Sequence, residues 1–330
     1  MKNRNFFGSN DVFLIAEIGN NHEGSLKNAL KLVDKAAEAG VDAVKFQTYQ
    51  TNLFLSNDVS KDRIKQLNRF QLNYQDFSKI AKYAKKKELT FFSTPLDLKS
   101  ADFLNKIQPL FKIASSDNNY KQLIDRVISF QKPTIISTGI INYKEINKLS
   151  NYIKAKKFRS KLAFLHCVSS YPTEIKDLNL GSILFLKDKF KNCFIGYSDH
   201  SIGIDACIYA SVLGAKIIEK HFTLNHNFSK FKDHTLSANP KELKEMVKKI
   251  RNVKTIIGLN AKKINEQEKK NILAMRRSIS IDKDLDKGQL IKKKDLVMRR
   301  PGSGYDYIKI KKFLGKKLKY TVKRGDVLKW

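Results

Sequence analysis

Polar residues interrupt or end eight short apolar segments in the first four-fifths of this sequence. Two of them are lysines, Lys45 and Lys112, which are costly to bury without anionic partners. Five more carry hydroxyl groups: Thr94, Ser115, Ser137, Ser169 and Ser198. Short hydroxyl donors beside two ammonium groups suit a ligand that carries a phosphate and a carboxylate. Each hydroxyl alone could cap the helix that follows it, but N-capping leaves the lysines unexplained.

Two histidines, His200 and His221, come at the ends of the last two apolar segments. Neighbouring strands lie about 4.8 Å apart, so imidazoles at their ends can converge on one ion. Two histidines completed by water and substrate oxygens suit a divalent cation such as Mn²⁺, Co²⁺ or Mg²⁺. A closed structural zinc site would need four ligands, which the sequence does not offer. Either histidine alone could be an ordinary core residue, and His166, which lies inside its segment, is expected to be one.

The segments that must position these residues alternate in type. The apolar, β-rich runs are 12–18, 42–48, 90–94, 110–115, 134–138, 162–168, 193–199 and 215–222. The segments with helical periodicity are 25–40, 74–89, 98–107, 120–130, 143–157, 181–190, 203–214 and 240–253. Eight strands, each followed by a helix, predict an α/β fold, the (β/α)₈ or TIM barrel, in which chemistry occurs where the strands end. The long connection 49–73 predicts an extra short helix within 60–70.

The run 215–224 places three charged residues next to one another. Strand alternation puts Glu219 and His221 on one face, assigned to the barrel mouth, and Lys220 on the other. Lys220 is therefore expected to face the helical layer, without a catalytic role.

The pattern changes near residue 260. Residues 261–275 are polar and partly helical, and residues 276–330 form short β-like pieces separated by the turn signals "DKG" and "KRG". These features predict a barrel domain over 1–260, a linker over 261–275 and a small β-rich domain over 276–330.

The charge balance is strongly basic, with 64 Lys and Arg against 32 Asp and Glu and a net charge of +32. The lysines are scattered through almost every helical segment, which favours a solvated surface. Attraction of small anionic substrates is an alternative, and nucleic-acid binding is disfavoured because no basic arm or patch is concentrated. No apolar run approaches the roughly 18 residues of a membrane span, and residues 1–10 lack the apolar core of a signal peptide. With three sparse cysteines, these features predict a cytoplasmic protein.

Eight motifs in order resemble the sialic acid synthase (N-acetylneuraminate synthase) family over nearly the whole chain. They are "IAEIGNNHEGSLKNALKLVDKAAEAGVDAVKFQTY", "FFSTP", "KIASSD", "IISTG", "HCVSSYPT", "IGYSDHS", "IIEKHFT" and "RRPGSG". That family joins a (β/α)₈ barrel to a C-terminal antifreeze-like (SAF) domain. It condenses phosphoenolpyruvate with N-acetylmannosamine or a related open-chain N-acyl hexosamine, releasing phosphate and forming a nine-carbon 2-keto sugar acid.

The resemblance implies a role for each matching position. The phosphoenolpyruvate set would be Lys45, Thr94, Lys112, Ser115, Ser137, Ser169 and Ser198. The sugar-side set would be Glu17, Gln47, Asp117, Tyr171, Glu219 and Asp233. His200 and His221 would hold the metal, with Mn²⁺ preferred, and Glu17, Lys45, Lys112 and Glu219 are the catalytic candidates. Arg300 would enter the barrel of a partner subunit, which implies a domain-swapped homodimer.

Three positions depart from the common pattern of the family. Asp117 stands where many relatives carry glutamate, Phe231-Lys232 replace a Gly-Pro pair, and Ile140 replaces a methionine. None of these changes removes a metal or phosphate position. Legionaminic and pseudaminic acid synthases share the motifs and are the alternative functions; "EIGNNHEGS" is weakly nearer to the sialic and legionaminic branches. A more distant alternative is a non-catalytic barrel that binds anionic ligands.

Overall fold

The computed structural model of the protein describes residues 11–259 and 261–330. The predicted absence of a signal peptide in residues 1–10, and the predicted domain end at residue 260, fall outside these residues. The chain divides into two compact units, 1–258 and 259–330, and each is described by itself.

The described part of the first unit contains one parallel sheet. Its eight strands are β1 (Phe13–Gly19), β2 (Ala43–Thr48), β3 (Thr90–Pro95), β4 (Phe111–Ile113), β5 (Thr134–Ser137), β6 (Leu162–His166), β7 (Phe194–Asp199) and β8 (Ile217–His221). The order is β3-β2-β1-β8-β7-β6-β5-β4, so the first strand pairs with the last, and β3 contacts β4. The sheet therefore closes on itself, and the predicted (β/α)₈ barrel is confirmed.

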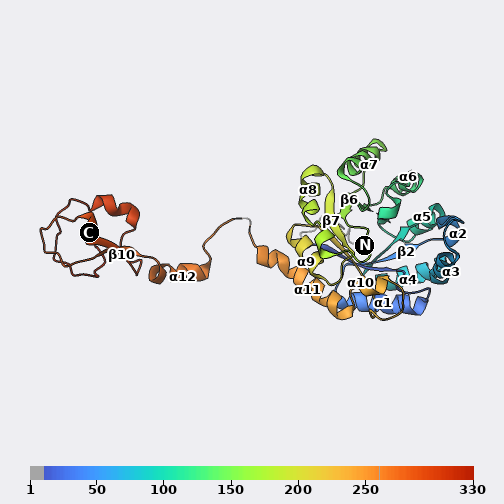
Figure 1. Cartoon of the computed structure of the whole chain (residues 1–330), viewed down its shortest axis with the longest axis horizontal. Coiled ribbons are helices and arrows are strands. Elements are labelled where there is room, and N and C mark those ends of the chain that lie inside the picture. Colours follow the sequence, from blue (N-terminus) through green and yellow to red (C-terminus); the bar gives the residue numbers. More distant parts are fainter. Residues whose placement is uncertain (1–10, 260) are drawn as a thin grey trace. The chain divides into compact units, whose positions relative to one another are not determined.

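Helices surround these strands (Figure 1). They are α1 (Leu26–Ala39), α2 (Thr51–Phe54), α3 (Lys61–Phe70), α4 (Tyr74–Lys86), α5 (Leu98–Asn105), α6 (Lys121–Ser129), α7 (Tyr143–Ala155), α8 (Gly181–Lys189), α9 (Asp205–Val212), α10 (Asp233–Leu236) and α11 (Pro240–Ile257). The extra helix expected in the long second connection is α3, preceded by the single turn of α2. Ser25 caps α1 by accepting a hydrogen bond from the Asn28 N–H, and Gly40 ends it at a φ of 85°. Among the described residues, no helix combines the length and the apolar character that a membrane crossing requires.

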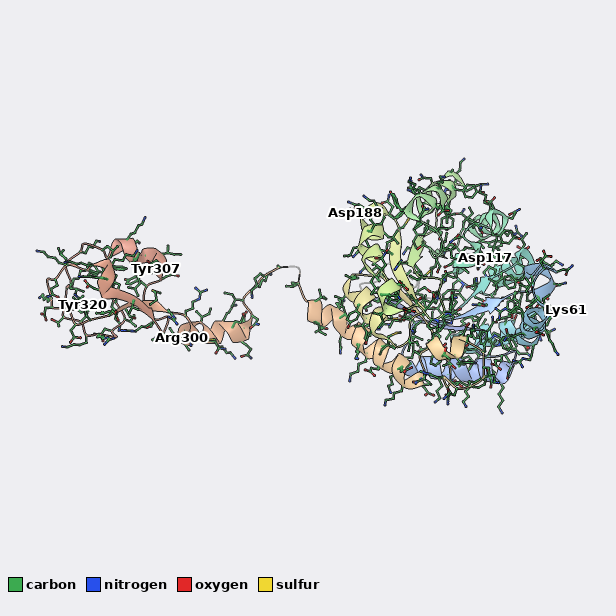
Figure 2. The ribbon with its side chains drawn as sticks, viewed as in Figure 1. Lys61, Asp117, Asp188, Arg300, Tyr307 and Tyr320 are labelled. Atoms are coloured by element: carbon green, nitrogen blue, oxygen red, sulfur yellow. The ribbon has the colours of Figure 1, made fainter. Side chains whose placement is uncertain are left out.

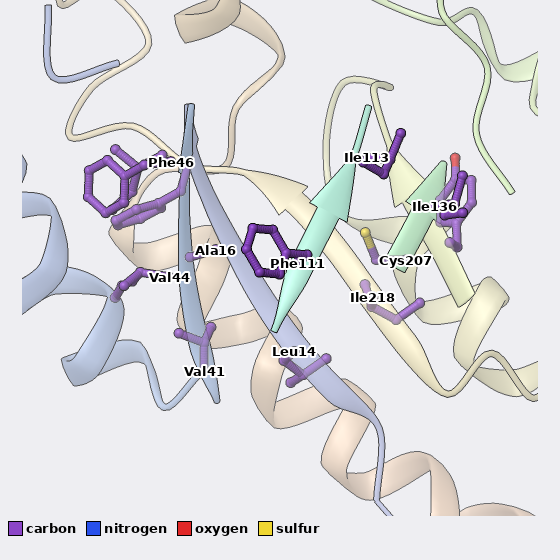
Figure 3. Packing of buried hydrophobic residues seen from close by; sticks show 14 of the residues in the cluster. Leu14, Ala16, Val41, Val44, Phe46, Phe111, Ile113, Ile136, Cys207 and Ile218 are labelled. Carbon is purple, nitrogen blue, oxygen red and sulfur yellow. The ribbon is translucent and has the colours of Figure 1, made fainter. Parts of the chain in front are cut away.

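Strand alternation divides the apolar residues of the barrel into two clusters. One cluster fills the interior and includes Phe13 and Ile15 of β1 and Ile217 of β8. The other lies between the strands and the helices; Figure 3 shows Leu14 and Ile218 in this outer layer, together with other labelled residues of β1, β2, β4 and β5. Successive residues of a strand therefore point alternately into the barrel and toward the helices, so two neighbours along a strand contact different layers.

The second unit has its own small core. It contains α12 (Glu266–Met275), β9 (Ser278–Ile281), β10 (Leu296–Arg299) and the 3₁₀ turns η3 (Lys293–Asp295) and η4 (Tyr307–Lys312). β9 and β10 pair antiparallel, with Leu296 opposite Ile281. Elsewhere in the described residues of this unit, the predicted β-like pieces form isolated bridges, for example Leu285 with Val322. Ile279, Ile281, Phe313 and other apolar residues form the core.

Candidate active site

The inward-facing rows of the barrel become polar at the carboxyl ends of the strands. In β1 the row runs Phe13, Ile15, Glu17, and in β8 it runs Ile217, Glu219, His221. Five of the six remaining strands follow the same rule, with inward polar residues at Lys45, Gln47, Thr94, Lys112, Ser137 and Ser198; in β6 the inward residues Ala163 and Leu165 are apolar. The structure thus gathers at one end of the barrel the side chains that the strand-end argument predicted.

Four charged side chains form a buried network at this end. Lys45 Nζ lies 2.8 Å from Glu17 Oε2 and 3.8 Å from Glu219 Oε2. Lys112 Nζ lies 3.1 Å from Glu219 Oε1, which also accepts a hydrogen bond of 2.8 Å from the Ser198 hydroxyl. Each of the four charged residues is at most 4% exposed. The lysines therefore obtain the anionic partners that burial demands, and those partners are carboxylates of the protein itself.

The two carboxylates of the network differ in basicity. Burial raises the pKa of Glu17 to about 7, against the opposing effect of the Lys45 ammonium. Burial also acts on Glu219, but the ammonium groups of Lys112 and Lys45 outweigh it and hold the pKa of Glu219 at about 2. Two neighbouring carboxyls with separated pKa values can play different parts in proton transfer, and Glu17 is the one that can exchange a proton near neutral pH.

Hydroxyl groups surround the network on the side of β5 and β6. The buried hydroxyl oxygens of Ser137 and Ser169 have no hydrogen-bond partner within the described residues. The Ser115 hydroxyl lies 3.0 Å from Cys167 Sγ. A cavity of about 480 Å³ is lined by Cys167 and Ser169 but otherwise mainly by residues of α7, of α8 and of the loops after β5 and β6; neither Ser115 nor Ser137 lines it. The buried hydroxyls of Ser137 and Ser169, which lack partners, are free to donate to an anionic ligand.

His200 and His221 lie side by side, with ring centroids 5.5 Å apart. His200 Nδ1 lies 2.7 Å from the Val168 carbonyl oxygen, which fixes the proton on Nδ1 and leaves Nε2 as an acceptor. His221 Nδ1 is buried without a partner in the described part of the chain. Burial lowers the pKa of both imidazoles, and the proximity of His200 lowers that of His221 further. Neutral imidazoles with a free ring nitrogen fit a metal-ligating pair.

A third ligand of the usual kind does not accompany the histidine pair among the described residues. Within residues 11–259 and 261–330, no group of three or more His, Cys, Asp or Glu side chains is arranged to hold a metal ion. Tyr171 packs against His200 with a centroid distance of 4.2 Å and so covers one side of the pair. His166 makes a 2.8 Å hydrogen bond with the Leu178 carbonyl and is the satisfied core histidine that was expected.

Of the predicted sugar-side residues, Gln47 contacts the network, and Asp117 and Asp233 follow the carboxyl ends of β4 and β8. Gln47 Nε2 lies 3.4 Å from Glu17 Oε1, and Gln47 accepts a hydrogen bond of 2.9 Å from Asn20 Nδ2. Asp117 follows β4 in the 3₁₀ turn η1 (Ser115–Asp117), and burial raises its pKa. Asp233 begins α10 beyond β8, and burial raises its pKa to about 6.

Phe231, which belongs to the pair that replaces the family's Gly-Pro, packs its side chain against the barrel domain. Its ring meets Phe70 of α3 edge-on, at a centroid distance of 5.0 Å. The adjoining His234 is buried and its Nδ1 lies 2.7 Å from the Thr223 hydroxyl. The loop that carries Asp233 is thus anchored on both sides, although the Gly-Pro pair common in the family is absent.

Arg300 is the one predicted site residue that lies outside the first unit. It follows β10 in the second unit and is exposed, whereas Asp117 belongs to the barrel (Figure 2).

Three residues of the site escaped the sequence reasoning. Cys167 shares the inward parity of Ser169 and contacts Ser115, a role that the sparse spacing of the three cysteines does not indicate. Gly139 packs so closely on the hydroxyls that a Cβ atom would lie 2.3 Å from Ser169 Oγ and 2.8 Å from Ser115 Oγ. Asn20 orients Gln47. The parity rule could have identified Cys167, but no local signal distinguishes Gly139 or Asn20.

Comparison with known proteins shows the family to which both parts of the chain are similar. A model of the NeuB family matches residues 32–262, and a model of the SAF domain matches residues 276–330. An uncharacterized protein of Methanocaldococcus jannaschii is 39% identical, over 97% of this chain and 94% of its own length. The N,N'-diacetyllegionaminic acid synthase of Campylobacter jejuni is 34% identical, over 96% of this chain and 99% of its own length. The pseudaminic acid synthase of the same organism is 35% identical, over 98% of this chain and 97% of its own length.

A solved structure is similar as well. The N-acetylneuraminic acid synthetase of Leptospira borgpetersenii aligns with a TM-score of 0.75 and 35% identity, covering 80% of this chain and 90% of that one. The family model spans most of the chain, and the relatives align along nearly all of it. The chain therefore belongs to the NeuB family, the family of sialic, legionaminic and pseudaminic acid synthases.

Proposed function

We propose that this protein is an N-acylneuraminate (sialic acid) synthase, a transferase that forms a carbon–carbon bond. It condenses phosphoenolpyruvate with N-acetylmannosamine or a related open-chain N-acyl hexosamine, releasing phosphate and forming a nine-carbon 2-keto sugar acid. The observation that carries the proposal is the buried set of two ammonium groups beside hydroxyls that lack partners. Such a set matches the phosphate and carboxylate of phosphoenolpyruvate.

In this proposal, Lys45, Lys112 and the hydroxyls of Thr94, Ser115, Ser137, Ser169 and Ser198 bind phosphoenolpyruvate. The ligand's anionic groups take over the ammonium contacts that Glu17 and Glu219 make in the free protein. Carbon 3 of phosphoenolpyruvate attacks the sugar aldehyde, water adds to the resulting oxocarbenium carbon, and the tetrahedral intermediate expels phosphate. Fixed cations and oriented donors lower the barrier by positioning the reactants and stabilising charge.

We assign to Glu17 the transfer of a proton, either from the water that adds to the intermediate or to or from a sugar hydroxyl. Its pKa of about 7 suits a group that both accepts and returns a proton near neutral pH. Gln47, Asp117, Tyr171, Glu219 and Asp233 are assigned to the sugar.

His200 and His221 would hold a divalent cation, with Mn²⁺ preferred over Mg²⁺ or Co²⁺, completed by water and substrate oxygens. When bound, such a cation would act as a Lewis acid that polarises the sugar aldehyde. The chain's own contribution is to keep both imidazoles neutral and the Nε2 atom of His200 free, through burial and the Val168 hydrogen bond.

The sugar is assigned only by class. The similarities to the legionaminic and pseudaminic acid synthases of C. jejuni are nearly equal, at 34% and 35% identity. Legionaminic and pseudaminic acid synthesis are therefore the alternative functions. We also propose that Arg300 of the partner subunit completes the site in a domain-swapped homodimer.

A phosphate-release assay with purified protein tests the function. Mn²⁺, phosphoenolpyruvate and each of a panel of sugars are supplied, including N-acetylmannosamine and the diacetylated 6-deoxy hexosamines. Sugar-dependent phosphate release with one member is expected and identifies the branch. Reactions without sugar, and Lys112→Met protein, serve as controls. An absence of release with every sugar, in protein that is folded and binds Mn²⁺, contradicts the proposal.

A further inference from the structure

A second buried ion pair lies on the outer face of the sheet, behind the histidine pair. Lys220 Nζ is 2.7 Å from Asp199 Oδ2, and both side chains are completely buried. Lys220 belongs to the outward-facing row of β8 with Ile218, and Cys207 of α9 contacts the same Asp199 oxygen at 3.5 Å. The pair is therefore enclosed between the strands and the helical layer, away from the substrate side of the barrel.

Every polar group of this ion pair has partners. Asp199 Oδ1 accepts hydrogen bonds from the Tyr197 hydroxyl at 2.9 Å and from the Ser201 N–H and hydroxyl at 3.0 and 2.7 Å. Lys220 Nζ also donates to the Ser201 carbonyl oxygen at 2.5 Å. Asp199 and Lys220 therefore hold each other, and between them they hold both backbone polar groups of Ser201.

Stability alone does not explain such a pair. Removing two charges from water costs so much that apolar residues of the same volume often stabilise a fold equally well. A polar cluster with every group satisfied does, however, restrict the geometry of the segments that it joins.

The cluster joins the two segments that carry the histidines. Asp199 and Lys220 are direct partners in the β7–β8 ladder. His200 and His221 are the next residues along each strand and point to the opposite face. Beyond β7, Asp199 binds the N–H of Ser201 and Lys220 binds its carbonyl, so the backbone on the far side of His200 is fixed as well.

We propose that Lys220 and Asp199, with Ser201, form a clamp that sets the separation and orientation of the His200 and His221 imidazoles. Lys220 and Asp199 are then positioning residues for a divalent cation, acting from the opposite face of the sheet. This inference rests on the proposed function, in which the two histidines hold that cation.

The test compares Lys220→Met with the wild-type full-length protein. Mn²⁺ affinity is measured by electron paramagnetic resonance titration, and the imidazole signals of metal-free protein by ¹H–¹⁵N NMR. The variant is expected to bind Mn²⁺ at least about tenfold more weakly, as is usual when outer-sphere partners of a metal site are removed. The His200 and His221 signals are expected to shift.

Arg251→Met is the matched control. Arg251 Nη2 pairs with Asp42 Oδ2 at 2.7 Å, and Asp42 directly precedes β2, at the end of the barrel opposite the histidines. Its loss is expected to lower stability without changing Mn²⁺ affinity or the two imidazole signals. Unchanged affinity and unchanged signals in Lys220→Met overturn the clamp.

One further variant separates positioning from stability. In Asp199→Leu/Lys220→Met the buried charges are replaced by apolar groups, so stability is expected to recover while Mn²⁺ affinity does not. Recovery of both overturns the proposal. Should Lys220→Met fail to fold, the double variant, which leaves no unpaired buried charge, is measured in its place; wild-type affinity and wild-type imidazole signals in the double variant overturn the clamp equally. If the wild-type protein binds no Mn²⁺, the metal assignment fails. The clamp is then tested by the imidazole signals alone, and unchanged signals in Lys220→Met overturn it.

Discussion

The Nζ atom of Lys112 lies 3.1 Å from Oε1 of Glu219, although the two residues stand 107 positions apart in the chain. Lys112 belongs to β4 and Glu219 to β8, strands that are not neighbours in the sheet. The pair therefore crosses the interior of the barrel rather than following a strand ladder. Glu219 also accepts a hydrogen bond from the Ser198 hydroxyl, and its other carboxylate oxygen lies 3.8 Å from Lys45 Nζ. Glu219 is therefore the anion that both lysines share.

Glu219→Gln is expected to destabilise the protein by about 3–5 kcal/mol, because removing one partner of a buried pair leaves a charge without compensation. Urea unfolding at neutral pH measures the change. Lys35→Met is the control, since Lys35 and Glu38 form an exposed pair that should contribute less than about 1 kcal/mol. A loss in Glu219→Gln no larger than in the control would show that Glu219 does not hold the network together.

Gly139→Ala is expected to lower sugar-dependent phosphate release by about 100-fold, because a displacement of about 1 Å in positioned groups has effects of that size. The new Cβ would lie 2.3 Å from Ser169 Oγ and 2.8 Å from Ser115 Oγ, so both hydroxyls must move. Gly181→Ala is the control, because a Cβ atom there would lie 3.9 Å from Asn179 Oδ1, an ordinary van der Waals contact. Activity equal to that control would remove Ser115 and Ser169 from the proposed phosphoenolpyruvate site.

His200→Ala and His221→Ala are each expected to weaken Mn²⁺ binding by at least about 100-fold, since loss of a ligand costs more than loss of an outer-sphere partner. Both variants should keep the far-ultraviolet circular dichroism of the folded protein. His226→Ala, which removes a partly exposed histidine paired with Glu242, should bind Mn²⁺ like the wild type. Normal Mn²⁺ affinity in either of the first two variants refutes that residue's assignment as a ligand.

Glu17 should make stability fall as pH rises. Its pKa is raised from 4.5 to about 7, so between these values the folded protein holds a proton that the unfolded chain has released. The folded state is therefore favoured at the acid end of this window, and the advantage is lost as pH rises to about 7. Glu219 acts oppositely: its contribution is present above pH 4.5 and is lost as pH falls toward 2.

Urea unfolding at pH 5 and pH 8 measures the Glu17 effect. Glu17→Gln should lose less stability between these two values than the wild type, because glutamine does not ionise. Equal losses in the two proteins would mean that the Glu17 carboxyl is already ionised at pH 5.

Mixing two inactive variants tests the domain-swapped homodimer. Arg300→Ala and His221→Ala should each be inactive alone. After co-refolding, a mixed dimer has one barrel with intact His221 that receives intact Arg300 from its partner subunit. About a quarter of wild-type activity is then expected for random pairing. If the mixture stays inactive while each protein is dimeric, Arg300 does not act across subunits.

The sequence by itself determined the barrel, the order of its strands and, for the last strand, the face that meets the interior; some strand ends differ by one or two residues, as in β4 and β6. Hydrophobic periodicity and strand alternation are local properties, so Glu219, Lys220 and His221 could be assigned to faces before any contact was known. The same kind of local pattern predicted the extra helix α3.

The tertiary structure alone decided which groups meet. Lys45 could have paired with an anion of the ligand only, but the register of β1 against β2 and the curvature of the barrel bring Glu17 and Glu219 within 4 Å of it. Register between neighbouring strands also places Asp199 beside Lys220, and the loops after β4, β5 and β6 pack Gly139 onto the hydroxyls of Ser115 and Ser169. These contacts join strands and loops far apart in the chain, and their geometry depends on register and closure, which no local pattern of residues encodes.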